Sequence, residues 1–527
     1  MLNLIRPVMQ PFLRTYLTSF KKALQTPRES QQQLLKKIIH RLAETEYGRS
    51  FKIKANDDYP AFAAKMPMQS FDELCEWIER QQQTEKNILV AEPVLFYEKT
   101  SGSSAAAKMI PYTKSLKDSF NRMFCIWLAD LLANLPELKT GKTFISVSPA
   151  FSQQEVTGQN KPIGLADDSQ YLNTWARVLL KPFLVLPSQL KSLQSPENFK
   201  HGLALTLLAE EALEIISIWN PSWLEIILDY IQENTEILIR DLQRGTASLE
   251  NLTFTCKSVS PERLLMLKAK AIDWPCLWAK LQLISCWTSA QANVAAGRLA
   301  AKFPKVFLQG KGLLATEAPM TLPLIEAGGF VPMLTEVFFE FLDDQENLRL
   351  VHELEVGREY EIILTQQGGL YRYRIGDGVR VTGFYQATPC LEFIGRTREV
   401  CDLVGEKLNE RFVQTCLARL SQSGDFQILL PVLSEKPHYL LLVDNRVAVA
   451  ASMAAELDEL LCAAYHYRQA RMLGQLRPVK ILAVAKARPI YFDYFMSKGL
   501  KFGDIKHKFL ITNLTDAEAL VLRAQSE

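Results

Sequence analysis

The chain has almost no net charge and no long uninterrupted apolar run. Lys plus Arg number 60 against 58 for Asp plus Glu, so the formal net charge is +2. A balance this close gives no whole-chain field to concentrate an anionic polymer, which weighs against nucleic acid as a partner. The most apolar long stretch, Leu203 to Ile231, contains five acidic residues and Pro221. A membrane span needs about 20 predominantly apolar residues, so we expect none.

The sequence also lacks the patterns of disulfide, zinc and secretion chemistry. Its nine cysteines are odd in number and contain no C-x-x-C, which predicts free thiols in a reducing compartment, the cytoplasm. The six histidines are scattered, without H-E-x-x-H or a Cys/His cluster at zinc spacing, so a structural zinc site is not expected. Arg6, Arg14, Lys21 and Lys22 interrupt any signal-peptide core.

The length and composition indicate a large soluble enzyme. A chain of 527 residues corresponds to about three to four structural units at roughly 150 residues each. Its 48% hydrophobic and 22% charged residues lie in the globular range, which excludes disordered and fibrous classes. The nature of the chemistry has to come from motifs.

The pattern along the chain predicts an α/β fold with α+β elements. Residues 1 to about 90 are expected to be helical, including 31–46 and 71–85, the latter with Ser70 as N-cap. Residues 203–231 are expected to form two helices that are broken at Asn220-Pro221. Helices and strands alternate over 110–300, which favours a sheet flanked by helices. The strand-rich segment 305–400 suggests an antiparallel sheet or small barrel. The individual strands that we expect are 88–90, 94–97, 143–147, 337–342, 359–365, 379–384, 390–394, 426–433, 439–443 and 480–484. The further helices that we expect are 115–133, 169–180, 223–240, 261–270 and 448–470.

A change of pattern near residue 397 predicts the domain boundary. After Gly395-Arg396-Thr397-Arg398 the chain starts a new α+β unit. We therefore expect a domain over 1–397 and a second over 398–527. No internal repeat or low-complexity linker accompanies this boundary.

Small hydroxyl residues surround a glycine in Thr100-Ser101-Gly102-Ser103-Ser104. This segment follows an apolar predicted strand and is itself followed by Lys108. Such a loop lets backbone N–H and side-chain O–H groups approach a phosphate, and the lysine adds charge. A solvated Ser/Gly loop is about as good an interpretation. The stretch matches neither G-x-x-x-x-G-K-[ST] nor G-x-G-x-x-G, so a kinase-like P-loop is not supported.

Two carboxylates stand at the ends of other predicted strands. Glu317, in Leu313-Leu314-Ala315-Thr316-Glu317, could hold a Mg²⁺ ion that bridges phosphate oxygens, or could be a solvated edge residue. Asp377, at a predicted strand-to-turn junction, could accept both hydroxyls of a ribose, with Arg396 near the same sugar. The alternative for Tyr371-Arg372-Tyr373-Arg374 is structural, with tyrosines inward and arginines paired on the surface.

A lysine-rich segment, Lys501 to Lys508, lies close to the C-terminus. Such segments are usually solvated. Lys506 on a terminal domain could nevertheless neutralise charge that develops at an acyl phosphate.

These segments, taken in order, resemble the auxin-responsive Gretchen Hagen 3 family of acyl acid amido synthetases, within the acyl-adenylate-forming enzymes. The resemblance covers nearly the whole chain. It rests on Thr45-Glu46-Tyr47-Gly48, Thr100 to Ser104, Lys108-Met109-Ile110-Pro111-Tyr112-Thr113, Gly312 to Glu317, Gly357 to Glu361, Gly369 to Asp377, Val381 to Phe384 and Gly405 to Leu408. Each member is weak alone, and the ordered set is specific.

The resemblance implies a large N-terminal domain of β-sheets and a small barrel flanked by helices, plus a small mobile α+β C-terminal domain. It implies ATP and Mg²⁺ as cofactors, with Glu317 at the metal and Lys506, Glu317 and Lys108 as catalytic residues. The residues it assigns to ATP are Thr100, Ser101, Gly102, Ser103, Ser104, Lys108, Ala315, Thr316, Asp377 and Arg396. The chain departs from the family pattern at Ala105, at Ala318 and after Lys506.

The implied function is that of an ATP-dependent ligase. It would adenylate a small carboxylic acid and transfer the acyl group to an amine, expected to be an amino acid. A thiol acceptor such as coenzyme A, and a catalytically degenerate nucleotide-binding protein, are the alternatives. The sequence leaves open the acid, the acceptor and whether the protein is a monomer or homodimer. Trp175, Trp287 and Phe330 are guesses for the acyl pocket.

Overall fold

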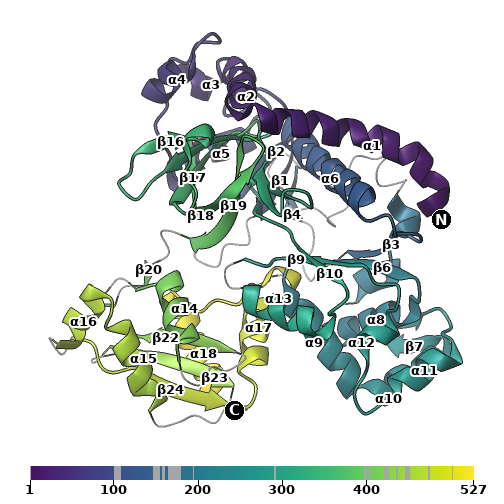
Figure 1. Cartoon of the computed structure of the whole chain (residues 1–527). Coiled ribbons are helices and arrows are strands. Elements are labelled where there is room, and N and C mark those ends of the chain that lie inside the picture. Colours follow the sequence, from purple (N-terminus) through teal and green to yellow (C-terminus); the bar gives the residue numbers. More distant parts are fainter. Residues whose placement is uncertain are drawn as a thin grey trace. The chain divides into compact units, whose positions relative to one another are not determined.

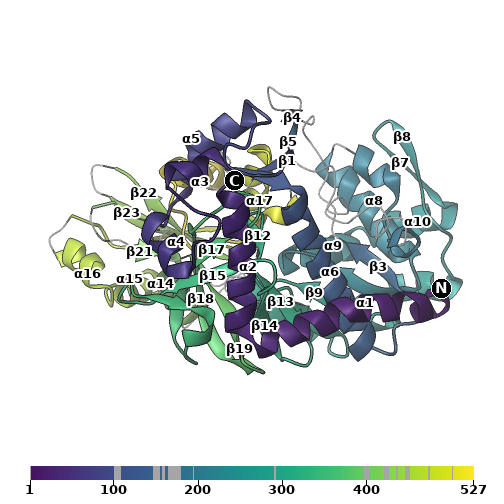
Figure 2. The ribbon, with the colours of Figure 1, turned by 90° about the horizontal axis from the view of Figure 1, so that it is seen from above.

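The computed structural model falls into two compact units (Figures 1 and 2). Among the described residues, the N-terminal unit comprises 2–99, 108–375 and Val379–Phe393, and the C-terminal unit comprises Gly376–Gly378 and the residues from Ile394 onward. The predicted boundary at 397/398 lies outside the described residues and stays a prediction. The structure describes residues 2–99, 108–145, 155–156, 161–163, 180–193, 195–289, 292–396, 400–401, 403–404, 406, 408–420, 426–434, 437–444, 452–472, 475–500 and 502–526.

The first 82 residues are mainly helical, as predicted, although the predicted helix 31–46 ends at Leu42. The helices are α1 (Leu2–Gln25), α2 (Pro27–Leu42), α3 (Glu46–Ser50), α4 (Tyr59–Lys65) and α5 (Phe71–Gln82). A capping box between Ser70 and Glu73 starts α5 at the predicted position. The predicted strand at Ile88–Val90 is wrong. The backbone N–H groups of Leu89 and Val90 donate to the side-chain oxygen of Gln81, at 2.9 and 3.4 Å, and take no part in a ladder.

Helix α2 is attached to a distant strand through one buried side chain, Gln31. Its amide nitrogen donates to the carbonyls of Leu334 and Val337 at 2.9 and 2.7 Å, and its oxygen accepts the N–H of Phe339 at 2.8 Å. Phe339 belongs to β15 (Phe338–Leu342), which α2 crosses in Figure 2. The carboxamide thus satisfies backbone groups that would otherwise be buried without partners.

A four-stranded parallel sheet confirms the predicted α/β architecture (Figure 1). Its order is β10 (Phe307–Gly310), β9 (Leu283–Cys286), β6 (Leu213–Ser217), β3 (Lys142–Ile145). The helices that alternate with these strands are α6 (Lys114–Asn134), α8 (Pro196–Ala209), α9 (Pro221–Glu233), α10 (Thr235–Arg244), α11 (Pro261–Leu267), α12 (Trp274–Leu277) and α13 (Asn293–Lys302). Helix α1 packs along α6.

Two predicted helices in this region need correction. The segment 203–231 is not simply a pair of helices, because β6 lies between α8 and α9 and all five of its residues are buried. A strand buried on both faces reads as a continuous apolar run, which periodicity cannot separate from a helix. The predicted helix 223–240 is two helices, α9 and α10, divided at Asn234. The predicted helix 169–180 falls almost wholly outside the described residues.

The predicted strand-rich segment forms a five-stranded sheet. Its order is β16 (Leu348–Leu350), β15, β17 (Glu359–Thr365), β18 (Tyr373–Tyr385), β19 (Thr388–Arg396). The shorter paired strands of the unit are β1 (Val94–Lys99), β2 (Met109–Thr113), β4 (Glu155–Val156), β5 (Pro162–Ile163), β7 (Thr246–Leu249), β8 (Leu252–Thr255), β11 (Leu314–Ala315), β12 (Ala318–Pro319), β13 (Thr321–Leu324) and β14 (Gly329–Pro332).

The C-terminal unit is α+β, as predicted. Strands β22 (Gln427–Val432), β23 (His438–Asp444) and β24 (Lys480–Val484) form its sheet. The predicted helix 448–470 is divided into α15 (Met453–Leu461) and α16 (Tyr465–Met472). The unit also contains β20 (Val400–Cys401), β21 (Leu408–Asn409), α14 (Glu410–Ala418), α17 (Ala487–Ser497) and α18 (Leu514–Gln525).

Two sequence-level expectations concern the whole described chain. All nine cysteines lie in the described residues, and each is a free thiol. Among the helices that the structure describes, none combines the length and apolar character required to cross a membrane.

Candidate active site

Thr316 and Glu317 form a two-residue turn between paired strands. Ala315 of β11 lies opposite Ala318 of β12, which leaves these two residues at the tip. The Glu317 residue is 7% exposed. Ala318, which differs from the family pattern, is buried and is not among the residues with positive φ, so its Cβ adds no backbone strain there.

This turn is tied to β2, the strand that follows Lys108. The Tyr112 hydroxyl donates to the Thr316 carbonyl at 2.6 Å. The Tyr112 ring stacks on Phe96 and Phe120, with centroids 4.7 and 5.8 Å away. A rigid ring thus sets the distance between β2 and the turn that carries Glu317.

The loop between β17 and β18 holds the same turn from another direction. The Gln366 side-chain nitrogen donates to the Glu317 carbonyl at 3.1 Å, and its oxygen accepts from the Gly368 N–H. The Gln366 N–H donates to the Leu370 carbonyl at 2.9 Å. The structure therefore brings together the Thr316–Glu317 turn, the strand after Lys108 and the start of Gly369–Asp377.

Lys108 is the described member of the predicted phosphate-binding segment. It is half-buried, and its ammonium lies 5.5 Å from the Phe71 ring centroid. The strands on either side of the segment are antiparallel neighbours, with Lys99 of β1 opposite Met109 of β2. The predictions for Thr100, Ser101, Gly102, Ser103 and Ser104 lie outside the described residues, as does Ala105.

Asp377 is buried, 6% exposed, within β18. The predicted strand-to-turn junction is wrong, because the strand continues to Tyr385. Gly376 supplies an irregularity before the aspartate, with φ of 81°. Arg396 is the last residue of β19, and its side chain lies outside the described part of the chain.

The two arginines before Asp377 are structural, but only one is near the surface. Arg374 pairs with Glu361 at 2.9 Å, with side chains 18% and 11% exposed. Arg372 pairs with Glu340 at 2.8 Å, with side chains 7% and 1% exposed. The expectation that both arginines pair on the surface is therefore wrong for Arg372, while Tyr371 and Tyr373 are buried as that interpretation required.

Lys506 lies in the C-terminal unit and is exposed. The hydroxyl of Tyr491 in α17 donates to the Lys506 carbonyl at 2.6 Å. The next residue, His507, stacks on Phe426 with ring centroids 4.5 Å apart. These contacts hold the Lys506 carbonyl and the His507 ring, while the Lys506 residue is exposed.

Sequence reasoning missed a row of polar side chains at the carboxyl ends of the parallel strands. Ser217 of β6 is in register with Ser285 of β9, and Ser285 with Gln309 of β10. In-register residues of parallel strands face the same side of a sheet, so these three form a polar row. The polar row is buried, with exposures of 7%, 1% and 4%.

A second row lies two residues further along each strand, on the same face. It consists of Trp219, Trp287 and Lys311, and we call it the Trp–Lys row. The backbone ladder continues to this level, since the Trp287 N–H donates to the Trp219 carbonyl at 2.8 Å. The signal in the sequence is the repeated Ser-x-Trp after an apolar strand.

Contacts join the two rows to each other and to α6. The Lys311 ammonium donates to the Ser217 hydroxyl at 2.7 Å and lies 4.9 Å from the Trp219 ring centroid. The Trp127 indole N–H of α6 donates to the Gln309 side-chain oxygen at 2.8 Å. Trp219 and Trp287 have centroids 5.8 Å apart with planes inclined by 40°.

The predicted pocket residues lie partly in this region. Trp287 is a member of the Trp–Lys row. Phe330 of β14 packs against Gly310 and Gly312, where an added Cβ would lie 2.5 and 3.1 Å from its ring. Trp175 lies outside the described residues.

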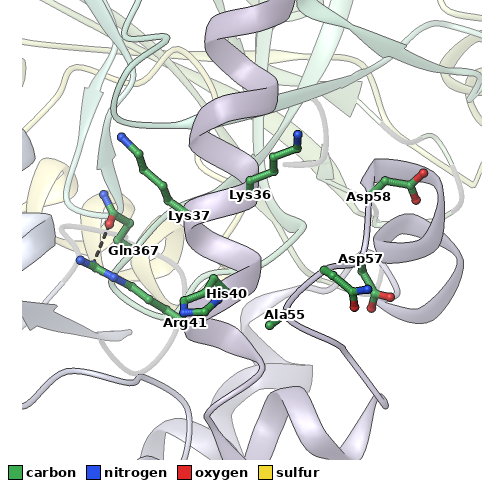
Figure 3. Close-up of a pocket in the computed structure, with 9 residues that line it drawn as sticks. Lys36, Lys37, His40, Arg41, Ala55, Asp57, Asp58 and Gln367 are labelled. Carbon is green, nitrogen blue, oxygen red and sulfur yellow. Dashed lines mark hydrogen bonds between the residues drawn. The ribbon is translucent and has the colours of Figure 1, made fainter.

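A separate hollow of about 730 Å³ lies beside α2 (Figure 3). Lys36, Lys37, His40 and Arg41 project from the helix, and Asp57 and Asp58 lie on the facing segment. The Arg41 guanidinium donates to Gln367 at 2.8 Å and to Ser115 at 2.7 Å. Arg41 therefore holds Gln367, the residue next to Gln366, and Gln366 in turn holds the Thr316–Glu317 turn.

Comparison with proteins of known structure shows the fold. The AtGH3.15 acyl acid amido synthetase in complex with 2,4-DB superimposes with a TM-score of 0.83 at 18% identity, over 97% of this chain and 96% of that one. A 2-hydroxyisobutyryl-CoA ligase in complex with 2-HIB-AMP superimposes with a TM-score of 0.51 at 12% identity, over 96% and 92%. The fold is therefore that of the acyl-adenylate-forming enzymes, as predicted.

Sequence comparison identifies the family. Indole-3-acetic acid-amido synthetase GH3.3 of Arabidopsis thaliana is 23% identical, over 90% of this chain and 88% of its own. Indole-3-acetic acid-amido synthetase GH3.8 of Oryza sativa subsp. indica is also 23% identical, over 90% and 87%. Family models match in order: the GH3 family N-terminal domain over residues 16–307, the central domain over 330–396 and the C-terminal domain over 407–515. These three consecutive matches span most of the sequence, and the chain belongs to the GH3 family.

Proposed function

We propose that this chain is an ATP-dependent ligase that joins a small carboxylic acid to an amino acid through an acyl-adenylate. The observation that carries the proposal is the Thr316–Glu317 turn, which Tyr112 and Gln366 hold against the strand after Lys108 and the loop before Asp377. Membership of the GH3 family and relatives named as amido synthetases support it.

The first half reaction forms the adenylate. A carboxylate oxygen attacks the α-phosphorus of ATP, the bond from that phosphorus to the β-phosphate oxygen breaks, and pyrophosphate leaves. In this proposal Thr100, Ser101, Gly102, Ser103, Ser104 and Lys108 stabilise the phosphate charge, Ala315 and Thr316 lie beside the nucleotide, and Asp377 and Arg396 bind its ribose. The exposed side chain of Lys506 adds positive charge.

The second half reaction forms the amide. The amine nitrogen attacks the acyl carbon, the bond from that carbon to the phosphate oxygen breaks, AMP leaves and the nitrogen loses a proton. No enzyme nucleophile is required, which agrees with the raised pKa of buried thiols such as Cys286.

Glu317 is the residue that we propose for Mg²⁺. Within the described residues there is no group of three or more His, Cys, Asp or Glu side chains that could hold a metal ion by themselves. One carboxylate fits Mg²⁺ nevertheless, because this ion usually takes its other ligands from substrate phosphates and water. When bound, the ion would neutralise charge on the phosphate oxygens.

We further propose that residues 1–397 and 398–527 act as domains and that the second reorients between the half reactions. The division into two compact units near residue 394 supports this. We also propose that the protein acts in the cytoplasm, which its nine free cysteines support.

A two-stage assay tests the proposal. Acid-dependent exchange of labelled pyrophosphate into ATP, screened over aryl, indole, fatty and cyclopentanone acids, detects the adenylate. AMP release is then measured with a mixed amino acid pool or with coenzyme A. Amino acid-dependent AMP release supports the ligase, and release with coenzyme A alone would assign a thiol acceptor. ATP binding without exchange by any acid would contradict the enzyme and favour a degenerate nucleotide-binding protein.

Lys506→Ala, with Lys508→Ala as the matched control, tests the terminal lysine in the same assay. We expect Lys506→Ala to slow pyrophosphate exchange more than it weakens ATP binding, and Lys508→Ala to do neither. Equal losses of exchange and ATP binding in Lys506→Ala would indicate misfolding, and wild-type exchange in this variant would remove the lysine from the proposed site.

A further inference from the structure

The polar row and the Trp–Lys row occupy the part of a parallel sheet where ligands bind. In open α/β sheets, binding crevices lie beyond the carboxyl ends of the strands. Ser217, Ser285 and Gln309 stand at or next to the last positions of three adjacent strands, and the Trp–Lys row extends just beyond them. Every member of the Trp–Lys row is half-buried, so this end of the sheet is partly open.

Two groups of the polar row have unused hydrogen-bonding capacity. The Ser285 hydroxyl and the Gln309 side-chain nitrogen are buried and have no hydrogen-bond partner among the described residues. The Gln309 side-chain oxygen accepts the indole N–H of Trp127, and this bond fixes the orientation of the amide. The amide nitrogen is therefore the group of Gln309 that remains as a donor. Buried polar groups nearly always have partners, so two unpaired groups on neighbouring strands indicate a ligand with acceptor atoms.

The charge beside these groups is positive. The Lys311 ammonium lies 2.7 Å from the Ser217 hydroxyl and 4.9 and 5.7 Å from the ring centroids of Trp219 and Trp127. Lys311 follows the same strand that carries Gln309, so its charge stands at the end of the sheet where the two donors lie. A cation at this place favours an anionic acceptor over a neutral one.

A carboxylate bound at this place would not be the one that is activated. A carboxylate that attacks phosphorus must keep its oxygen lone pairs available, and close pairing with an ammonium and two further donors would hold them in the ground state. The site would then bind a second carboxylate of the same substrate molecule. The indole rings of Trp219 and Trp287, whose planes are inclined by 40°, offer apolar surface for a flat group between the two carboxylates.

We propose that the polar row and the Trp–Lys row form the distal end of the acyl-acid pocket and select a dicarboxylic acid with a planar body. Lys311, Gln309 and Ser285 would bind the carboxylate that does not react. This inference rests on the proposed function, because it specifies the acid of the same ligase.

The test compares three acids of nearly equal shape in the pyrophosphate exchange assay. They are phenylacetate, 4-carbamoylphenylacetate and 4-carboxyphenylacetate, which differ in whether the distal group is absent, neutral or anionic. We expect the dicarboxylic acid to have a kcat/KM at least about tenfold above the values for both others, since a site built to pair a polar group discriminates against analogues without it. Equal values for the three acids would overturn the inference.

Lys311→Met and Lys305→Met are the matched variants. Lys305 is exposed and precedes the opposite, amino end of the same strand β10. The preference for the dicarboxylic acid should fall at least about tenfold in Lys311→Met and keep its wild-type value in Lys305→Met. An equal preference in both variants would overturn the inference. Ser285→Ala, which removes only a hydroxyl, should lower the same preference and covers the case in which Lys311→Met does not fold.

Failure of the subsite and failure of the proposed function give different results. Exchange with phenylacetate but no preference for the dicarboxylic acid would refute the subsite alone. If no acid supports exchange, calorimetric titration of the full chain with 4-carboxyphenylacetate and phenylacetate tests the subsite directly. Selective binding of the former that Lys311→Met removes would support the subsite, and binding of neither acid would refute it.

Discussion

Replacing Arg372 should destabilise the N-terminal unit more than any exposed charge substitution. The Arg372 guanidinium makes contacts of 2.8 to 3.1 Å with both carboxylate oxygens of Glu340. It also donates to the carbonyls of Ala63 and Met66 at 2.9 and 2.8 Å. Arg372→Met would leave the Glu340 charge buried, with the Tyr59 hydroxyl still donating to it at 3.0 Å but no cation to balance it.

Breaking a buried ion pair by removing one partner costs about 3 to 5 kcal/mol. A domain is typically stable by about 5 to 15 kcal/mol, so Arg372→Met should lose roughly a fifth of that margin or more. Arg374→Met is the control, because Arg374 is less buried and its pair with Glu361 should be worth about 1 to 3 kcal/mol. The measurement is the midpoint of guanidinium-induced unfolding.

A double variant distinguishes the buried charge from lost packing. Arg372→Met with Glu340→Leu removes both charges, and it should recover much of the loss because apolar replacement of a whole buried pair is often close to neutral. A remaining deficit would come from the carbonyls of Ala63 and Met66 and from the Tyr59 hydroxyl, which lose their partners in the double variant. The reasoning is wrong if Arg372→Met costs no more stability than Arg374→Met. It is also wrong if the double variant loses as much stability as Arg372→Met and Glu340→Leu lose in sum when each is made alone.

Three further predictions concern single groups. Tyr112→Phe keeps the stacked ring but removes the donor to the Thr316 carbonyl. It should therefore cost about 1 to 3 kcal/mol of stability and slow pyrophosphate exchange. Wild-type exchange would show that catalysis does not depend on this attachment of the Thr316–Glu317 turn. Asp377→Ala should abolish exchange, with about 2 to 4 kcal/mol lost if Asp377 binds both ribose hydroxyls as proposed, and wild-type exchange would contradict the assignment. Burial raises the pKa of the Cys286 thiol to about 12, so iodoacetamide at pH 8 should alkylate exposed Cys276 and spare Cys286, as mass spectrometry of peptides would show. Equal labelling of the two thiols would contradict the burial of Cys286.

Short-range patterns predicted many of the elements. The strands 359–365 and 480–484 occur at the predicted bounds, since each is an apolar run with turn residues near its ends. β6 was not predicted, because five buried residues between two apolar helices carry no strand periodicity. The division of 223–240 at Asn234 was also missed, since the residues on both sides favour helix.

The site was predictable only in part, and for a related reason. Ala315, Thr316 and Glu317 were assigned from the ordered motifs, and the hairpin places the last two at its tip. The polar row depends on the register among strands far apart in the chain, which no local pattern records. The burial of Arg372 likewise depends on Glu340 of another strand.

The attachment of α2 through Gln31 has a consequence for synthesis of the chain. Its partners Leu334, Val337 and Phe339 lie 303 to 308 positions later. At about 5 to 20 residues per second, the ribosome needs roughly 15 to 60 s to make that distance. During this interval α2 lacks its contacts with β15. The nascent chain therefore cannot complete this contact of α2 until translation has passed β15.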